Sequence, residues 1–456
     1  MAKEKVLVLG HMGRDEALAD RLDDVEMHFA GLWANPGLLK KAEASGGAFY
    51  VVNSITDPTQ LLQIAAEVKP SIFLTNFDDS LAAGVPDALK RQFPDLIMPC
   101  PLQEDARVEW DKFYLRKIVA EINDGYNPIN FMVEKPEDVA EAIYFFKNQG
   151  VEIAIKPRNL TGGKGVKVMG EGKHFNTYEE GQQYALEVLA AGDQTGVEIQ
   201  EKLEGHEFTL QIFTDGKTVI RPPATYDYPY REDGDTGPGT GGMGTFSMAP
   251  GKEESNGLLP FITQEDYDEA ISLAEKILQK MRERGHEFKG VIYPTFFKTP
   301  NGLKIVEVNA RGGDPELVNI LDLMEDDVDF VNVLKQIDAG ELTPDSIRYK
   351  KAASAMIYLV SPDYGYRQGP VCEFSINPEV MAANDVKIRF AAAERVRGNM
   401  FRTVGSSRSV GFSALGATPW EARSKIMHSI VNGVSHPLTL DFRRQVADQT
   451  YIKNLK

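Results

Sequence analysis

The sequence predicts an α/β protein that is α+β in part, with a parallel sheet first and mixed sheets after it. Over about the first hundred residues, short apolar runs alternate with stretches of helical spacing, which is typical of a parallel sheet covered by helices. Beyond residue 150, apolar runs follow one another with glycine-rich turns between them, which favours mixed strands. At about 150 residues per domain, a chain of 456 residues is expected to form two to four packed units.

The first unit is predicted to be Rossmann-like. Its apolar runs are short, and the connections between them are compact. Strands joined by helices in this way form parallel sheets. We expect strands at 5–9, 25–29, 49–53, 71–75 and 96–99, and helices at 15–22, at 58–68 and from residue 80.

The middle of the chain mixes helices, strands and one long loop. Amphipathic helices are expected at 106–122 and 264–284. The segment 222–252 is rich in Gly, Pro and Asp and is predicted to be a long loop, a feature that tends to be functional in compact domains. A turn at 299–302 predicts a hairpin. The expected strands are 153–157, 166–169, 197–201, 207–213, 218–221, 290–298 and 303–309, and a third unit begins with a strand at 352–360.

Composition restricts the classes of partner. With 67 acidic and 50 basic side chains, the net charge of −17 argues against general attraction to nucleic acid or anionic lipid, so a phosphate ligand needs a local site. Cys100 and Cys372 are the only cysteines, which argues against a disulfide framework and a cysteine-rich zinc site. No segment approaches the roughly 18 apolar residues of a membrane span, and the first residues lack a signal-peptide pattern. We expect a cytoplasmic protein.

The first candidate site is an apolar strand that ends in Lys156 and leads into a glycine-rich turn. Gly162 and Gly163 allow backbone N–H groups to approach phosphate oxygens, and Lys156 and Lys164 add positive charge. This combination suits a triphosphate, although the segment is not a Walker A loop. The alternative is a hairpin turn with an incidental lysine.

A second candidate lies at 200–209, where Glu201 ends one strand and Glu207 begins the next. The backbone near Leu203 can hydrogen-bond an adenine edge, and a carboxylate can accept hydrogen bonds from ribose hydroxyls. The alternative interpretation is an acidic surface hairpin.

The third candidate, residues 233–244, has six glycines in twelve residues. Glycines at this density indicate close approach of backbone to a ligand, with Asp235 and Thr236 supplying polar contacts. A flexible linker is the alternative, but linkers are usually rich in serine and would not place Met243 between glycines.

The fourth candidate is the end of the strand 303–309. Strand alternation places Glu307 and Asn309 on the same face. Two adjacent oxygen ligands suit Mg²⁺ that carries nucleotide phosphates, because this ion binds few protein ligands and completes its octahedron with phosphate and water. Arg311 can bind a phosphate or a carboxylate with its planar guanidinium. The alternative is a polar edge strand.

In this order, the four segments resemble the ATP-grasp superfamily, and more closely the phosphoribosylamine–glycine ligases. The most specific matches are 235–244 and 309–316, the second of which includes Gly313 and Asp314. Asp227-Tyr228-Pro229-Tyr230 is similar to the archaeal-type branch. The resemblance implies a Rossmann-like domain at 1–103, an ATP-grasp domain at 104–345 with a small ATP lid at about 130–205, and a C-terminal mixed β domain at 346–456.

The resemblance also implies roles for individual residues. Lys112 and Lys156 would contact ATP phosphates, the backbone at 201–203 would contact adenine, and Glu207 would contact ribose. Glu307 and Asn309 would bind Mg²⁺ or Mn²⁺. Asp235 and Arg311 would hold the ammonium and carboxylate of glycine. The second substrate would be phosphoribosylamine, and the enzyme would be a monomer or weak homodimer that binds neither nucleic acid nor membranes.

The first loop differs from the family's usual GxGGREHA, because Met12 replaces a glycine and Asp15-Glu16 replaces the EH pair. Gly10 and Gly13 still permit a tight turn at a helix N-terminus, and Arg14 supplies a cation, so we expect these three residues to bind phosphoribosylamine. A ligase paralogue with another amine or amino acid, and a nucleotide-binding regulator without catalysis, are the alternatives.

Overall fold

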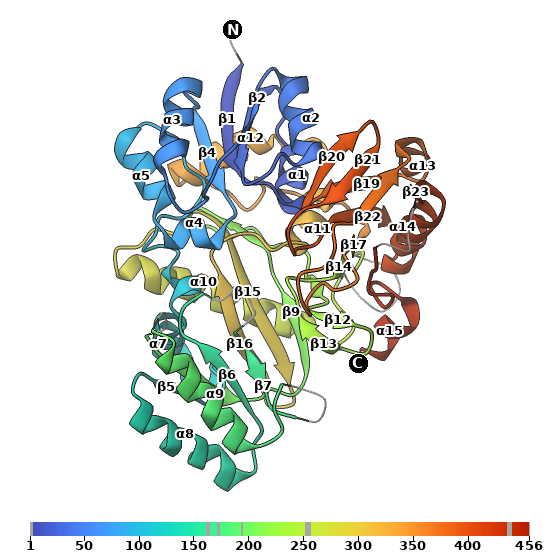
Figure 1. Ribbon diagram of the computed structural model, residues 1–456. Coiled ribbons are helices and arrows are strands. Elements are labelled where there is room, and N and C mark those ends of the chain that lie inside the picture. The colour runs from blue at the N-terminus through green and yellow to red at the C-terminus, as the bar shows by residue number, and fades with distance from the viewer. Residues whose placement is uncertain are drawn as a thin grey trace.

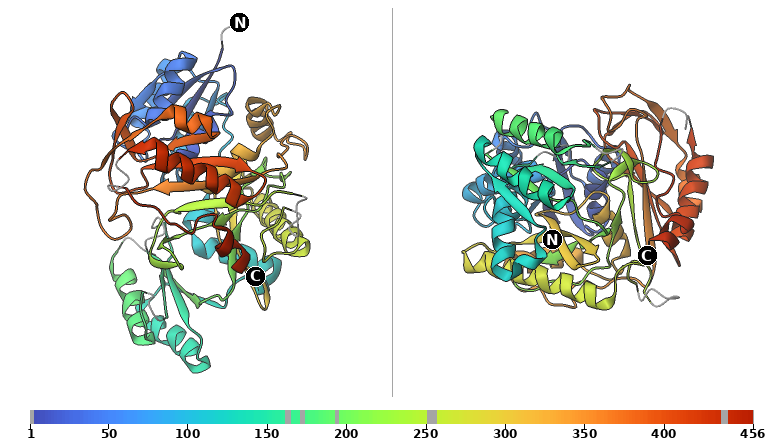
Figure 2. Two further views of the ribbon diagram at one scale, coloured as in Figure 1. Left: turned by 90° about the vertical axis from the view of Figure 1, so that its right-hand side faces the viewer. Right: turned by 90° about the horizontal axis from the view of Figure 1, so that it is seen from below.

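The computed structural model describes residues 3–160, 165–170, 174–192, 195–250, 257–435 and 440–455. The N-terminal segment, blue in Figure 1, lies at one end of the molecule, and a small teal and green unit lies at the other end. The C-terminal segment, in orange and red, covers one side. Figure 2 turns this side toward the viewer and shows the long red helix α14 (Pro419–Gly433) in front of the orange strands.

The first unit contains a parallel sheet with the strand order β3-β2-β1-β4, which confirms the Rossmann-like prediction. Residues 6–9 of β1, one of the two inner strands, are at most 1% exposed, because helices and the rest of the chain cover both faces of the sheet. The expected strand at 96–99 is reduced to a single bridge between Ile97 and Ile72. The elements are β1 (Glu4–Leu9), α1 (Gly13–Ala19), β2 (Val25–Gly31), α2 (Pro36–Ser45), β3 (Phe49–Val51), α3 (Thr59–Val68), β4 (Ile72–Thr75), α4 (Asp78–Ala82) and α5 (Val85–Gln92).

The helix expected at 106–122 is interrupted. It forms as α6 (Arg107–Trp110) and α7 (Lys112–Asn123), with a short 3-10 helix η1 (Asp124–Tyr126) after it. The break lies at Asp111, whose side chain accepts a hydrogen bond from the N–H of Tyr114 and so caps the second helix. The break places Lys112 in the first turn of α7.

The small unit is an antiparallel sheet with the order β5-β8-β6-β7 and two helices packed on it. Its buried side chains form a hydrophobic cluster separate from the main core. Figure 1 shows this unit projecting from the rest of the molecule. The elements are β5 (Asn130–Val133), α8 (Pro136–Gln149), β6 (Ile153–Pro157), β7 (Lys167–Val168), α9 (Tyr178–Ala190) and β8 (Val197–Glu201).

The central sheet contains the predicted hairpin, formed by β15 (Gly290–Thr299) and β16 (Gly302–Asn309). The single strand expected at 207–213 is instead two strands, β9 (His206–Thr209) and β10 (Ile212–Thr214), which pair with different parts of β15. The prediction of a strand at 218–221 is wrong, since this segment makes only a single β-bridge, from Val219 to Thr214. The expected helix at 264–284 is confirmed as α10 (Gln264–Glu283).

The long loop expected at 222–252 contains four short strands: β11 (Tyr226–Asp227), β12 (Tyr230–Glu232), β13 (Thr236–Gly239) and β14 (Gly244–Ser247). All residues of β14 are buried, so their backbone polar groups need partners, and they find them in β17 (Ala353–Leu359). The resulting sheet has the order β11-β14-β17-β22-β19 and spans residue 345, where the sequence suggested a domain boundary. The boundaries themselves stay a prediction.

The rest of the chain completes the C-terminal side and adds the helix at 330–339 beside the N-terminal unit, where Oδ1 of Asp338 accepts a hydrogen bond of 3.0 Å from the N–H of Met98. Among the residues that the structure describes, no helix has the length and apolar character needed to cross a membrane. The remaining elements are α11 (Glu316–Leu323), α12 (Phe330–Ala339), β18 (Glu373–Ile376), α13 (Pro378–Ala383), β19 (Val386–Phe390), β20 (Ala393–Arg397), β21 (Met400–Thr403), β22 (Val410–Gly416), β23 (Val434–Ser435) and α15 (Gln449–Asn454).

A buried ionic network joins the N-terminal unit to the C-terminal sheet. The guanidinium of Arg389 in β19 contacts the carboxylate of Asp20 and, at 2.7 Å, that of Asp322 in α11. Beside it, the Glu16 carboxylate accepts a hydrogen bond of 2.7 Å from the N–H of Phe390. Burial raises the pKa of Glu16 from 4.5 to about 7, although Arg389 partly opposes this shift.

This shift predicts a pH dependence of stability. A folded-state pKa above the unfolded value means that the folded protein binds the proton more tightly, so Glu16 lowers the unfolding free energy as pH rises from 4.5 to about 7. The loss amounts to about 3 kcal/mol at most. Glu16→Gln should remove this pH-dependent loss, so the measured curve of unfolding free energy against pH should be flatter between pH 4.5 and about 7.

The exposed Glu43 on α2 offers a matched control. Glu43→Gln should leave the pH dependence of the unfolding free energy as in the unaltered protein. Parallel curves for Glu16→Gln and the unaltered protein would contradict the assignment.

Candidate active site

Two lysines mark the expected phosphate region. Lys156 lies near the end of β6 and is 5% exposed. Burial lowers its pKa to about 8, and the carboxylate of Glu198 opposes this effect. Lys112 begins α7, its Nζ donates a hydrogen bond of 3.3 Å to the carbonyl of Asn159, and burial lowers its pKa as well. Sequence reasoning chose both lysines, and the charge of Lys112 contributes to the lowered pKa of Lys156.

Glu198 connects these lysines to the central hairpin. It pairs with Lys156 across β6 and β8, and its Oε1 lies 2.5 Å from Nε of Arg116 in α7. Burial alone would raise the pKa of Glu198, but Arg116 and Lys156 hold it below its usual value. Arg116 also donates to the carbonyls of Ile305 and Val306, at 3.0 and 2.7 Å. One guanidinium therefore ties the small unit to β16.

The candidate metal ligands meet as strand alternation predicts. Nδ2 of Asn309 lies 3.3 Å from Oε1 of Glu307, so both side chains point to one side of β16. Within the described ranges, no group of three His, Cys, Asp or Glu side chains is arranged to hold a metal ion. Two oxygen-bearing side chains on one side of a strand suit an ion that takes few protein ligands and is completed by phosphate and water.

The candidate nucleoside contacts lie on β8 and β9. Oε1 of Glu201 accepts a hydrogen bond of 2.8 Å from the N–H of Ile129, the residue before β5. This bond holds the Glu201 side chain against the start of the neighbouring strand. Leu203 follows in the connection between these strands. Burial, followed by the nearby Glu307 carboxylate, raises the pKa of Glu207 to about 8. Gly162, Gly163 and Lys164 lie outside the described residues.

Arg311 follows β16 and lies among carboxylates. Its Nη2 lies 3.1 Å from Oε1 of Glu109 and 3.6 Å from Oδ2 of Asp78. Burial raises the pKa of Glu109 to about 7, an effect that Arg311 opposes. The second oxygen of Glu109 accepts a hydrogen bond of 2.7 Å from the N–H of Ala310, which fixes the backbone just before Arg311. The guanidinium is thus oriented before any ligand arrives.

Asp235 lies in the short hairpin of β12 and β13. Its carboxylate accepts hydrogen bonds from Nη2 of Arg443, at 2.6 Å, and from the hydroxyl of Tyr451, at 2.8 Å. Both partners come from the C-terminal segment. Thr236, the next residue, is exposed and donates to the carbonyl of Asp233 at 3.0 Å. The two polar residues chosen from sequence are therefore held in place by the end of the chain and by their own turn.

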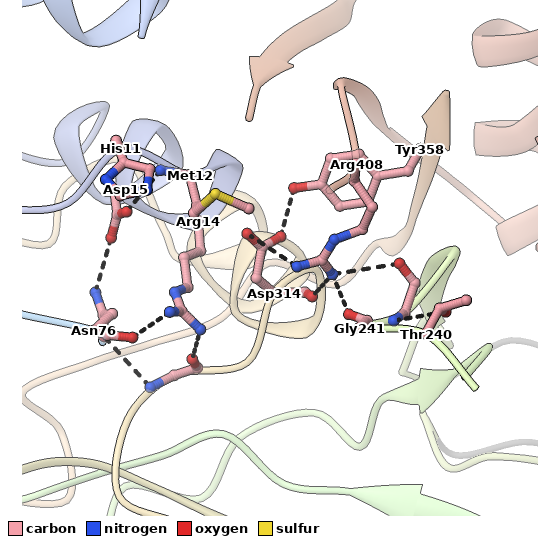
Figure 3. A network of polar contacts seen from close by, with 12 residues as sticks. His11, Met12, Arg14, Asp15, Asn76, Thr240, Gly241, Asp314, Tyr358 and Arg408 are labelled. Carbon is pink, nitrogen blue, oxygen red and sulfur yellow. Dashed lines mark hydrogen bonds and ion pairs between the residues drawn. The ribbon is translucent and has the colours of Figure 1, made fainter. Parts of the chain in front are cut away.

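The first loop is tightly packed around Asp15 (Figure 3). Asp15 caps the N–H of Met12 at 2.9 Å, and a Cβ added at Gly10 would lie 2.5 Å from its carboxyl carbon. A Cβ at Gly13 would lie 2.3 Å from the hydroxyl of Tyr358. These close contacts explain the glycines, and the capping hydrogen bond explains an acidic residue at position 15.

Arg14, Gly313 and Asp314 meet beside this loop. Arg14 donates hydrogen bonds to the carbonyls of Gly312, at 2.8 Å, and Asn76. The N–H of Gly313 donates a hydrogen bond to Oε1 of Gln211, and Asp314 accepts one from the hydroxyl of Tyr358. The structure thus gathers the three residues in one place, and their contact with a substrate stays a prediction.

Comparison with known proteins assigns the family. The model of the family described as phosphoribosylglycinamide synthetase, ATP-grasp (A) domain, matches residues 111–317. A phosphoribosylamine–glycine ligase from Methanocella arvoryzae is 33% identical over 419 residues, which are 91% of this chain and 90% of that protein. The one from Pyrococcus furiosus is 32% identical over 452 residues, 98% of this chain and 95% of that protein. The chain belongs to the phosphoribosylamine–glycine ligase family.

Solved structures agree with the ATP-grasp fold. A phosphoribosylamine–glycine ligase from Thermotoga maritima superimposes with a TM-score of 0.73 at 22% identity, covering 96% of this chain and 99% of that one. A biotin carboxylase from Campylobacter jejuni gives a TM-score of 0.71 at 10% identity, covering 99% and 97%. At these identities the likeness concerns the fold alone. The predicted fold class is confirmed.

Sequence reasoning missed several charged residues of this ligase-family site. Arg116 lies four residues after Lys112, a spacing that places both on one helix face, so this signal was available. Glu109 and Arg443 had no comparable signal, because their partners are distant in the sequence. Each of them orients a residue that the sequence had identified.

Lys156 provides a test of the phosphate region. Lys156→Ala removes a buried positive charge and should weaken nucleotide binding or use by about 10²-fold or more, as expected for a group that stabilises phosphate charge. Binding of ATP by calorimetry measures the effect. The exposed Lys117 on α7 is the control, and Lys117→Ala should bind ATP normally. Equal ATP affinity for Lys156→Ala and the unaltered protein would remove Lys156 from the site.

Proposed function

We propose that the protein uses ATP to join glycine to 5-phosphoribosylamine, which gives glycinamide ribonucleotide, ADP and phosphate in de novo purine biosynthesis. The observation that carries the proposal is the alignment of named ligases over about nine tenths of the chain, 91% for one relative. The buried lysines and Arg311 supply positive charge, and the Glu307–Asn309 pair supplies oxygen ligands for a metal ion.

In the first step, a carboxylate oxygen of glycine attacks the γ-phosphorus of ATP, and the bond from this phosphorus to the bridging oxygen breaks. Lys112 and Lys156 would reduce the repulsion between the carboxylate and the phosphates, because their charges lie in a buried, weakly screened region. Glu307 and Asn309 would hold Mg²⁺ or Mn²⁺, which when bound neutralises phosphate charge. The products are glycyl phosphate and ADP.

In the second step, the amine attacks the acyl carbon, a proton leaves the nitrogen and phosphate departs. Arg311 would keep the carboxylate end of glycine in position, since its guanidinium is already oriented by Glu109 and Asp78. Asp235 is the candidate residue for binding the ammonium group of glycine. Arg443 and Tyr451 would orient the carboxylate of Asp235. The reaction rests on positioning and electrostatics and requires no nucleophilic side chain.

One observation favours a second candidate, a ligase that accepts another amine. Both terminal nitrogens of Arg14 donate to backbone carbonyls, so this cation is already engaged where a substrate phosphate was expected. Asp15 and Asp78 lie nearby and would repel a phosphate. The activation of glycine is the same in both candidates, and only the product differs.

Release of ADP tests both steps. The protein should release ADP in the presence of ATP, Mg²⁺ and glycine plus freshly made phosphoribosylamine, and mass spectrometry should detect glycinamide ribonucleotide. Glycine-dependent release of ADP with a different ligation product would favour the second candidate. Absence of glycine-dependent ADP release would contradict both.

Arg311→Lys tests the amino-acid end of the site. Lysine keeps the charge but loses the planar, two-pronged geometry that matches a carboxylate, so the KM for glycine should rise by about 10-fold or more while the KM for ATP changes little. Steady-state kinetics with each substrate varied in turn measure the difference.

The exposed Arg348 provides a control with the same substitution, and Arg348→Lys should behave like the unaltered protein. If Arg311→Lys instead raises only the KM for ATP, Arg311 is a phosphate ligand and its assignment to glycine is wrong.

A further inference from the structure

The loop that carries Arg311 is held from several directions. We call residues 310–315 the Arg311 loop. Arg14 of α1 donates to the carbonyl of Gly312 at 2.8 Å, and the N–H of Gly313 donates to Oε1 of Gln211 at 2.8 Å. These contacts come from the N-terminal unit and from the central sheet. Figure 3 shows Arg14 approaching the loop from one side and Arg408 from the other.

Arg408 comes from the connection between β21 and β22 and is 7% exposed. One of its terminal nitrogens, Nη1, donates to the carbonyls of Gly241 and Asp314, with a longer contact of 3.3 Å to the carbonyl of Gly242. The other, Nη2, lies 3.8 Å from Oδ2 of Asp314. A single guanidinium therefore bridges the Arg311 loop and the glycine-rich segment 240–244.

Tyr358 of β17 reinforces this bridge. Its hydroxyl donates to Oδ1 of Asp314, and its ring centroid lies 5.0 Å from the guanidinium carbon of Arg408. The aromatic face favours a cation at this distance. Asp314 is thus contacted by two side chains of the C-terminal unit.

The glycines at 241 and 242 are required by this packing. A Cβ at Gly241 would lie 3.2 Å from the guanidinium carbon of Arg408. A Cβ at Gly242, whose φ is +96°, would lie 2.7 Å from Cδ of Pro315. The tip of the glycine-rich segment is therefore packed closely between Arg408 and the end of the Arg311 loop.

Burial of Arg408 makes this arrangement specific. A charged group removed from water needs hydrogen-bond partners, and here Nη1 of Arg408 finds them in backbone carbonyls of two separate loops. Displacement of either loop would leave a buried donor or acceptor without its partner, which is costly. The two loops are consequently fixed relative to each other.

We propose that Arg408 is a positioning residue for the amino-acid substrate, which acts by joining the glycine-rich segment to the Arg311 loop. This inference rests on the proposed function, because it assigns the glycine carboxylate to Arg311. The C-terminal unit, which is distant from the ATP-binding lysines in the sequence, then determines the affinity for glycine through one side chain.

Kinetics of Arg408→Gln and Arg408→Lys test the proposal. Loss of a charge-assisted hydrogen bond should raise the KM for glycine about 10-fold or more, with the KM for ATP within about 2-fold of normal. Arg408→Lys should restore part of the glycine affinity, because it keeps the charge. Arg402→Gln, on the exposed part of β21, is the control and should match the unaltered protein.

A general structural role would give a different result. If the KM values for glycine and ATP rise in equal proportion, or if Arg402→Gln has the same effect as Arg408→Gln, the proposal is overturned. Tyr358→Phe keeps the ring but loses the hydroxyl that contacts Asp314, so it should raise the KM for glycine in the same direction by a smaller factor. This variant also keeps the test available if Arg408→Gln does not fold.

Amide hydrogen exchange separates a failure of this proposal from a failure of the proposed function. In Arg408→Gln, peptides covering 239–246 and 310–316 should both exchange faster than in the unaltered protein, whichever substrate the protein uses. Faster exchange confined to residues near 408 would overturn the proposal. Faster exchange of both loops in a protein without glycine-dependent ADP release would support the bridge and contradict the function.

Discussion

The antiparallel pairing of β15 with β16 determines the geometry of the site. Its register places Glu307 opposite Thr295 and Asn309 opposite Tyr293, so the candidate metal ligands have one side of the sheet in common. The same strand ends at Asn309, two residues before Arg311. Because side chains alternate along a strand, a shift of the register by one residue would turn the ligands away and displace the loop that follows.

The hairpin can serve this purpose because buried charges around it are compensated. Arg116 joins Glu198 of the small unit to the carbonyls of β16, and Glu109 holds both Arg311 and the backbone before it. A buried charge without such partners would be costly. The pKa of Lys156 stays near 8, because the Glu198 carboxylate partly offsets the effect of burial, and this side chain can therefore attract phosphates.

Much of this could be predicted from the sequence, because the relevant patterns are local. The turn at 299–302 gave the hairpin, and strand alternation gave the Glu307–Asn309 pair. The strands within 222–252 were not predicted, since two to four residues carry little periodicity and β14 pairs with β17 more than a hundred residues later. Arg443 was missed as a contact for the same reason. Long-range pairing leaves no signal in the spacing of neighbouring residues.

Transfer of oxygen from glycine to phosphate tests the central claim, that the glycine carboxylate attacks the γ-phosphate of ATP. The measurement uses glycine with heavy oxygen in its carboxylate and mass spectrometry of the phosphate released during ligation. The account predicts that the phosphate contains one heavy oxygen atom, because cleavage of glycyl phosphate leaves the attacking oxygen on phosphorus. Phosphate without heavy oxygen, formed alongside ligated product, would contradict it.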